Sequence, residues 1–273
     1  MATEAPTSEP QQAEPGLVEK IFDSPIVGMA PWIALSLLVG PGRFEVAVVV
    51  ALVLSLVVLL SDVLRGRSVK LLAGADTAFF GAFAIVGLLA SDAAIEWLET
   101  WAGELSNIAL VIIAWGSIAI GVPFTIQYAR EQAPREYWDL PIFRHINVVI
   151  TAAWGVAFLV AAIAGFYGDA VLEDNDNLWT GWVVQIGALI VAIQFTQWYP
   201  DYASGRARQE AGVEGDPPPA VAELLIPLAG YLPVVGVLVL VFDAAPWWVG
   251  VGIIVAGGML TNALRQQIAA SKR

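Results

Sequence analysis

Residues 46–60 form an apolar run that only Ser55 interrupts. Such a run is too apolar for a water-exposed surface and too long for a buried strand, so it predicts a membrane-spanning helix. Windows of about 20 apolar residues, the length that crosses a bilayer, recur along the chain. We predict spans near residues 25–40, 44–64, 71–90, 105–123, 146–166, 179–199, 221–241 and 246–264. The expected fold is all-α: a polytopic integral membrane helix bundle with about eight transmembrane helices.

The first of these spans is the shortest. Residues 26–39 supply about four helical turns before the turn at Gly40, Pro41 and Gly42. A re-entrant hairpin is the alternative, and it would move the N-terminus and Lys20 to the other side of the membrane. We favour a full crossing because it keeps Lys20 with the other basic residues.

Composition excludes several classes of protein. Charged residues make up 14% of the chain, against about 25% in soluble domains, and this excludes a water-soluble enzyme. The net charge of −12 disfavours nucleic acid as a partner. With no Cys, one His and no recognised catalytic or phosphate-binding motif, we expect no enzyme activity, no cofactor and no metal site. The acidic balance also predicts a halophilic source, the alternative being simply an acidic tail and acidic loops.

Basic residues predict the orientation, because loops rich in Lys and Arg stay in the cytoplasm. The N-terminal tail and the loops after the second, fourth, sixth and eighth spans hold 12 of the 13 basic residues, and only Arg43 falls on the opposite side. The opposite loops are acidic and contain Asp92, Glu96, Glu99, Glu104, Asp169, Glu173, Asp174, Asp176 and Asp243. We therefore expect a cytoplasmic-membrane protein with both termini in the cytoplasm.

The chain divides into five segments. We predict a mobile cytoplasmic tail over residues 1–24, a six-span body over 25–200, a Pro/Gly-rich cytoplasmic linker over 201–220, a two-span hairpin over 221–264 and a basic cytoplasmic tail over 265–273. The linker contains Pro217, Pro218 and Pro219, which favour a stiff extended spacer.

Polar side chains inside the spans gather near the cytoplasmic side. The candidate residues are Asp62, Asp76, Gln127, Arg130, Arg144, His145, Asn147, Gln194 and Gln197. This layer either lines a vestibule or holds the helices together. A charge within a span costs about 2.5 kcal/mol or more, which makes Asp76 a functional candidate. Asp76 is either a carboxylate stabilised near a helix N-terminus or a group that handles protons or cations.

A stretch beginning at Pro123 carries a family resemblance. It contains Gln127, Glu131, Pro134, the run Phe143-Arg144-His145-Ile146-Asn147, Trp154, Phe158, Leu159 and Tyr167. Over roughly residues 22–199 the chain resembles the intracellular septation protein A family of bacterial inner membrane-spanning proteins. It departs from that family at Phe143 and His145, where Trp and a second Arg are usual, and in the two spans after residue 220.

The resemblance implies a multi-pass membrane protein linked to envelope integrity and septation, with other membrane or septation proteins as partners. We accordingly predict a structural or assembly role within the lipid bilayer. The alternative is a small transporter or ion-coupled permease that uses the membrane-embedded carboxylates Asp62 and Asp76.

Overall fold

A computed structural model describes residues 25–175 and 177–271, and these residues fold entirely into helices and connecting loops. The helices are α2 (Pro25–Gly28), α3 (Ala30–Leu38), α4 (Phe44–Leu64), α5 (Leu71–Leu89), α6 (Asp92–Ala119), α7 (Phe124–Gln132), η1 (Arg135–Tyr137), α8 (Pro141–Ala170), η2 (Leu178–Val183), α9 (Val184–Glu210), α10 (Val221–Val241) and α11 (Trp247–Ser271). The predicted mobile tail 1–24, together with Lys20, Asp176, Lys272 and Arg273, lies outside the described residues.

Seven helices in the described part of the chain are long and apolar enough to cross a membrane. They are α4, α5, α6, α8, η2 with α9, α10 and α11. The helical membrane bundle is thus confirmed in outline, and the chain is a multi-pass membrane protein, but the predicted count of eight spans is not confirmed.

The difference lies in the first predicted span, which is broken at Met29 into α2 and α3. Pro31 stands in the first turn of α3, where its missing N–H prevents a continuous hydrogen-bond ladder through this point. The nine residues of α3 rise only about 14 Å, too little to cross a bilayer alone.

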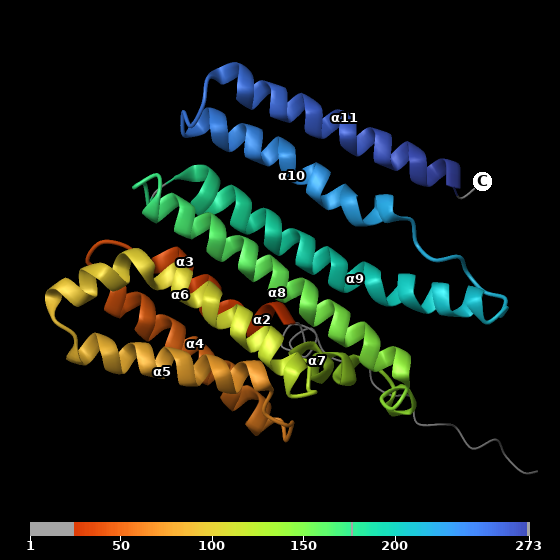
Figure 1. The fold of residues 1–273 in the computed structure, drawn as a ribbon, viewed down its shortest axis with the longest axis horizontal. Coiled ribbons are helices and arrows are strands. Elements are labelled where there is room, and N and C mark those ends of the chain that lie inside the picture. The colour runs from red at the N-terminus through yellow and green to blue at the C-terminus, as the bar shows by residue number, and fades with distance from the viewer. Residues whose placement is uncertain (1–24, 176, 272–273) are drawn as a thin grey trace, which may run out of the picture.

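The helices run antiparallel between two ends of the bundle (Figure 1). The loops 65–70, 133–140 and 211–220 lie at one end, which we call the basic end. The loops 39–43, 90–91 and 242–246, together with residues 171–175 and 177, lie at the other, the acidic end. The α2–α3 pair connects the two ends, because Gly28 lies against Tyr128 near the basic end and Arg43 follows α3 at the acidic end.

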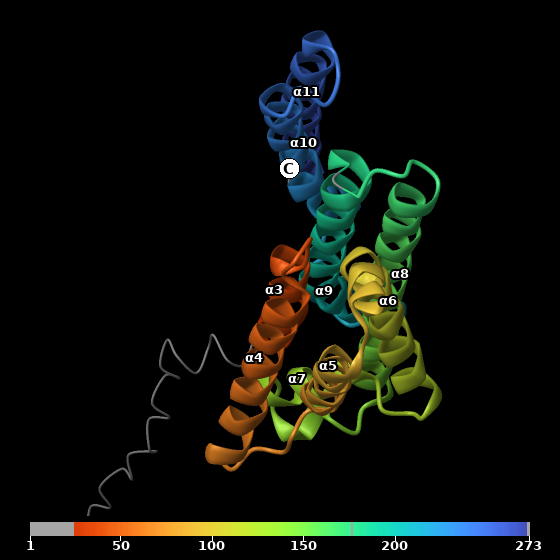
Figure 2. The same ribbon diagram turned by 90° about the vertical axis from the view of Figure 1, so that its left-hand side faces the viewer.

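One large hydrophobic core contains side chains from every α-helix from α3 to α9, and a separate small core lies between α10 and α11. In Figure 2 the α10–α11 hairpin stands apart from the body and lies beside α9. The two hairpin helices approach closely because small residues face each other: a Cβ on Gly236 would meet the carbonyl oxygen of Gly250 at 2.5 Å. Close backbone approach at small residues is a common way for membrane helices to associate.

The boundary between body and hairpin differs from the prediction. Residues 201–210 are helical, because α9 continues through Pro200 to Glu210, and only the later part of the predicted linker is irregular. That part is anchored to the body: Pro218 packs against Gly205, and the indole N–H of Trp198 donates to the carbonyl oxygen of Ala220 at 3.1 Å. At the C-terminus, α11 extends through Arg265 to Ser271, so most of the predicted basic tail is helical.

Candidate functional site

A buried ion cluster occupies the basic end, where α4, α5 and α7 meet. The Lys70 ammonium contacts Asp62 at 2.8 Å and Glu131 at 3.1 Å, and Arg67 reaches the other Glu131 oxygen at 3.6 Å. The Lys70 and Asp62 side chains are 3% and 4% exposed, so the pair is almost completely removed from water. We call Asp62, Lys70, Glu131 and Arg67 the Lys70 cluster. It ties the α4–α5 loop to α7.

Two neighbouring α7 side chains complete this end. The side-chain oxygen of Gln127 accepts a hydrogen bond from the backbone N–H of Leu71 at 2.6 Å, where α5 begins. The centroid of the Tyr128 ring lies 5.3 Å from the Lys70 ammonium, and within the described residues the buried Tyr128 hydroxyl has no hydrogen-bond partner. Burial raises the pKa of Tyr128, and the surrounding carboxylates raise it further, so this phenol stays neutral at physiological pH.

Asp76 lies farther inside the bundle and is completely buried. One of its oxygens accepts a hydrogen bond from the indole N–H of Trp32 at 2.7 Å, and the other has no hydrogen-bond partner among the residues that the structure describes. The neighbouring Thr77 donates its hydroxyl group to the carbonyl oxygen of Ala73. Asp76 and Asp62 therefore have separate partners, Trp32 for Asp76 and Lys70 for Asp62.

The other candidates of the predicted polar layer are spread over three helices. Asn147 lies within hydrogen-bonding distance of Thr125, Arg130 stacks over Trp138, and His145 lies 3.4 Å from the Tyr199 hydroxyl. Arg144 and Gln197 are exposed, and Gln194 is half-buried. The structure thus brings Asp62 and Gln127 together around the start of α5, but it does not unite the nine candidates in one site.

A cavity of 440 Å³ opens between α7, α8 and α9 near the basic end, and we call it the basic-end cavity. Ile146, Ile150 and Tyr137 make its wall largely apolar. Thr125 and Asn147 also line it, but their polar atoms already bond to each other.

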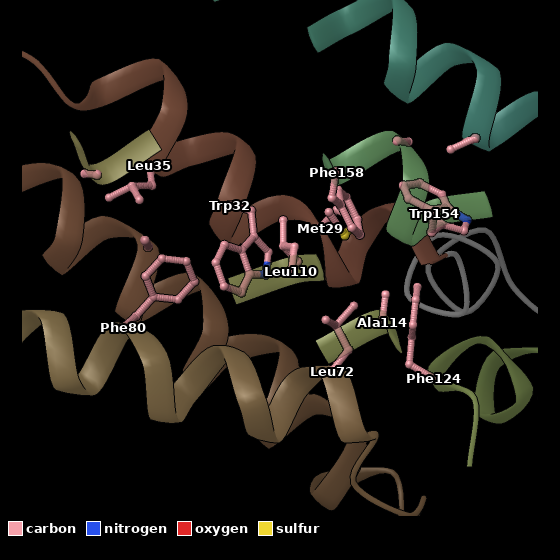
Figure 3. Close-up of a cluster of buried hydrophobic side chains, with 14 of the residues drawn as sticks. Met29, Trp32, Leu35, Leu72, Phe80, Leu110, Ala114, Phe124, Trp154 and Phe158 are labelled. Carbon is pink, nitrogen blue, oxygen red and sulfur yellow. The ribbon is translucent and has the colours of Figure 1, made fainter. Parts of the chain in front are cut away.

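A larger cavity of 640 Å³, the acidic-end cavity, lies between α3, α6, α8 and α9. Its charged lining residues are Glu96, Glu99, Glu104, Asp169 and Arg43. The cavity extends along α6 from Glu96 to Leu110, a depth of about 21 Å at 1.5 Å per residue. Figure 3 shows its inner wall, where Trp32, Met29, Leu110 and Phe158 come together.

Glu104 lies inside α6, which differs from the prediction. It was assigned to an acidic outer loop, but α6 begins at Asp92, and Glu104 lies about 18 Å along that helix. Glu104 is 7% exposed and faces the cavity. The sequence from Asp92 to Ala119 contains no Pro, which permits one continuous helix of 28 residues. This feature could have placed Glu104 inside a helix.

One aromatic layer separates the two cavities. Ile150 lines the basic-end cavity and Ala157 the acidic-end cavity, about 10 Å apart along α8. Between them lies Trp154, which is 2% exposed, packs on Phe158 and donates its indole N–H to Thr196 at 2.9 Å. The cavities therefore approach the middle of the body from opposite ends without joining.

No protein-family model matches this chain, and neither a curated protein nor a solved structure matches it.

Proposed function

We propose that this protein is a small membrane transporter that binds an organic cation in the acidic-end cavity. The observation that carries the proposal is the cavity itself, which reaches from the acidic end to Trp32 in the interior of the bundle. The basic-end cavity lies on the other side of the buried Trp154 along α8. Two opposed cavities at one barrier are what a protein needs to expose a solute to each side in turn.

Charge favours a cation as the solute. Four carboxylates and one guanidinium line the acidic-end cavity, and a low-dielectric wall strengthens their field. The inner wall supplies Trp32 and Phe158, and aromatic faces attract quaternary ammonium groups. Among the described residues no group of three or more Asp, Glu, His or Cys side chains is placed to hold a metal ion, so an organic cation suits this lining better than a metal.

The experiment measures equilibrium binding of radiolabelled choline to the purified full-length protein in detergent. The competitor is 3,3-dimethylbutanol, which has the shape of choline without its charge. We expect the alcohol to compete at least tenfold more weakly, since a cation–aromatic contact and a carboxylate together contribute about 1.4 kcal/mol or more. Equal competition by the two compounds, or no choline binding, would refute the proposal.

Glu104→Gln should weaken choline binding about tenfold, because it removes the most deeply placed carboxylate of the cavity. Asp243→Asn is the matched control: Asp243 is exposed at the same end, in the α10–α11 loop and outside the cavity. Its substitution should leave choline binding unchanged. An equal loss in both variants would indicate a general effect of surface charge.

We further propose that the basic end faces the cytoplasm and that both termini lie on that side of the cytoplasmic membrane. The proposal is supported by the clustering of arginines at one end of the bundle. Single cysteines replacing Ala93, Glu173 or Ala244 should react with an impermeant thiol reagent in intact cells, and a cysteine replacing Gln209 should not. Labelling of position 209 alone would reverse the orientation.

The assembly role implied by the septation protein A resemblance is the competing proposal. It requires a protein partner on the basic loops and gives no role to the acidic-end cavity. The choline experiment therefore separates the two, because an assembly protein has no reason to prefer a cation over its neutral isostere.

A further inference from the structure

The acidic-end cavity contains a pair of neighbouring carboxyl groups. Glu104 of α6 and Asp169 of α8 both line it, and the Glu104 carboxyl group lies against Gly165, one helical turn before Asp169 on the same face of α8. Two carboxyl groups held this close repel each other when both are ionised, and sharing one proton relieves that repulsion. The arrangement therefore favours a pair that shares a single proton.

Packing against α8 holds the Glu104 side chain in place near Asp169. A Cβ added to Gly165 would collide with the Oε1 atom of Glu104, so only a glycine at this point of α8 lets the carboxyl group lie against the helix. Gln185 of α9 approaches the same point, and Thr180 of η2 covers the neighbouring turn at Gly168. The contact is thus built by three segments that are distant in the sequence.

The charged groups around the pair do not supply a cation at the same depth. On α6, Glu96 and Glu99 lie two turns and one turn toward the acidic end, and they add negative charge. In the α3–α4 turn, Arg43 lies with its guanidinium over Gly40, and its backbone N–H donates to Glu99 at 3.1 Å. The α9 and η2 side chains that face the pair, Gln185 and Thr180, are uncharged.

A second, independent observation concerns the inner wall of the same cavity. Trp32 forms part of this wall and bonds to the fully buried Asp76, which has a second oxygen without a partner. A buried carboxyl oxygen without a donor is costly unless another group satisfies it at some stage of the working cycle. The interior beyond Trp32 therefore offers one more acceptor to a proton or a cation.

We infer that the protein exchanges its organic cation for a proton, and that Glu104 and Asp169 are the exchange site. The cation enters between the two carboxylates, the shared proton leaves to water through the acidic end, and the charge of the site is unchanged. The reverse steps reload the proton after the cation departs. This inference rests on the proposed cation-binding function and adds the coupling ion to it.

The test measures proton release when choline binds to the purified full-length protein, using a pH indicator in weakly buffered detergent solution. We expect about one proton per bound choline, and a choline affinity that rises about tenfold per pH unit while the pair is protonated. Glu104→Gln and Asp169→Asn should bind choline more weakly and release no proton. Asp243→Asn should release as much as the wild type.

The outcomes separate the two claims. Choline binding without proton release and without pH dependence would overturn the exchange inference and leave cation binding intact. No choline binding at any pH would overturn both. The pH dependence of the wild-type protein decides the question by itself if either variant fails to fold.

Discussion

Lys70→Met is the substitution for which the structure predicts the largest loss of stability. Lys70 neutralises Asp62 at 2.8 Å in a site that is almost fully buried. Without the ammonium, the buried Asp62 carboxyl group would lose the cation that it contacts, and its other oxygen already has no hydrogen-bond partner in the described part of the chain. Removing one partner of a buried ion pair costs about 3–5 kcal/mol, because the other charge remains uncompensated.

The reciprocal change should cost less. In Asp62→Asn the Lys70 ammonium keeps Glu131 at 3.1 Å and the face of Tyr128 at 5.3 Å, so it is not left alone. Losing one charged hydrogen bond under these conditions costs about 1–3 kcal/mol. The double variant should be more stable than the sum of the single losses predicts, because it has no orphaned carboxylate.

The assay is equilibrium unfolding of the purified protein in mixed micelles of increasing SDS content, followed by circular dichroism. Arg206→Met is the matched control: Arg206 pairs with Glu210 at 3.4 Å, but its side chain is 55% exposed. Breaking this exposed pair should cost about 0.5 kcal/mol or less. The reasoning is refuted if Lys70→Met loses no more stability than Asp62→Asn or Arg206→Met.

Three further substitutions test particular contacts in the same unfolding assay. Trp32→Phe should cost about 1–3 kcal/mol, because Asp76 loses its one hydrogen-bond donor; replacing Asp76 by Asn in the same chain should recover part of that loss. Gly236→Ala should destabilise the α10–α11 hairpin by about 1–3 kcal/mol, since its Cβ would press on the α11 backbone, whereas Gly258→Ala enters open space and should be nearly neutral. Tyr128→Phe should be neutral or stabilising, because the buried hydroxyl that it removes has no hydrogen-bond partner in residues 25–175 and 177–271; a clear loss of stability would contradict this.

The sequence predicted both ends of two of the long helices. The span predicted over residues 44–64 coincides with α4, and the one over 221–241 coincides with α10. It did not predict the helix break at Met29, because the residues on both sides are apolar and a hydropathy window averages over them. At Pro200 the prediction ended the helix too early, since α9 continues through this residue for ten more residues.

Candidate residues for function were harder to rank. Asp76 was selected because a charge within a span is unusual, and it is indeed completely buried, but its partner Trp32 lies 44 residues away in the chain. Glu104 was passed over because it stood one residue before a predicted span. Its depth became visible only when α6 proved to begin at Asp92.

The sequence alone determined that this chain is a bundle of membrane helices with most of its arginines in alternate interhelical loops. The hydropathy and charge of each segment can be read from that segment without knowing its neighbours in space. The tertiary structure decided which buried charges meet. Lys70 contacts Glu131 of α7, Asp76 bonds to Trp32, and Glu104 lies against α8 at Gly165, all according to how the helices pack side by side. Inside a membrane an unpaired charge is costly, so these pairings depend on distances across the whole bundle that no single window of sequence contains.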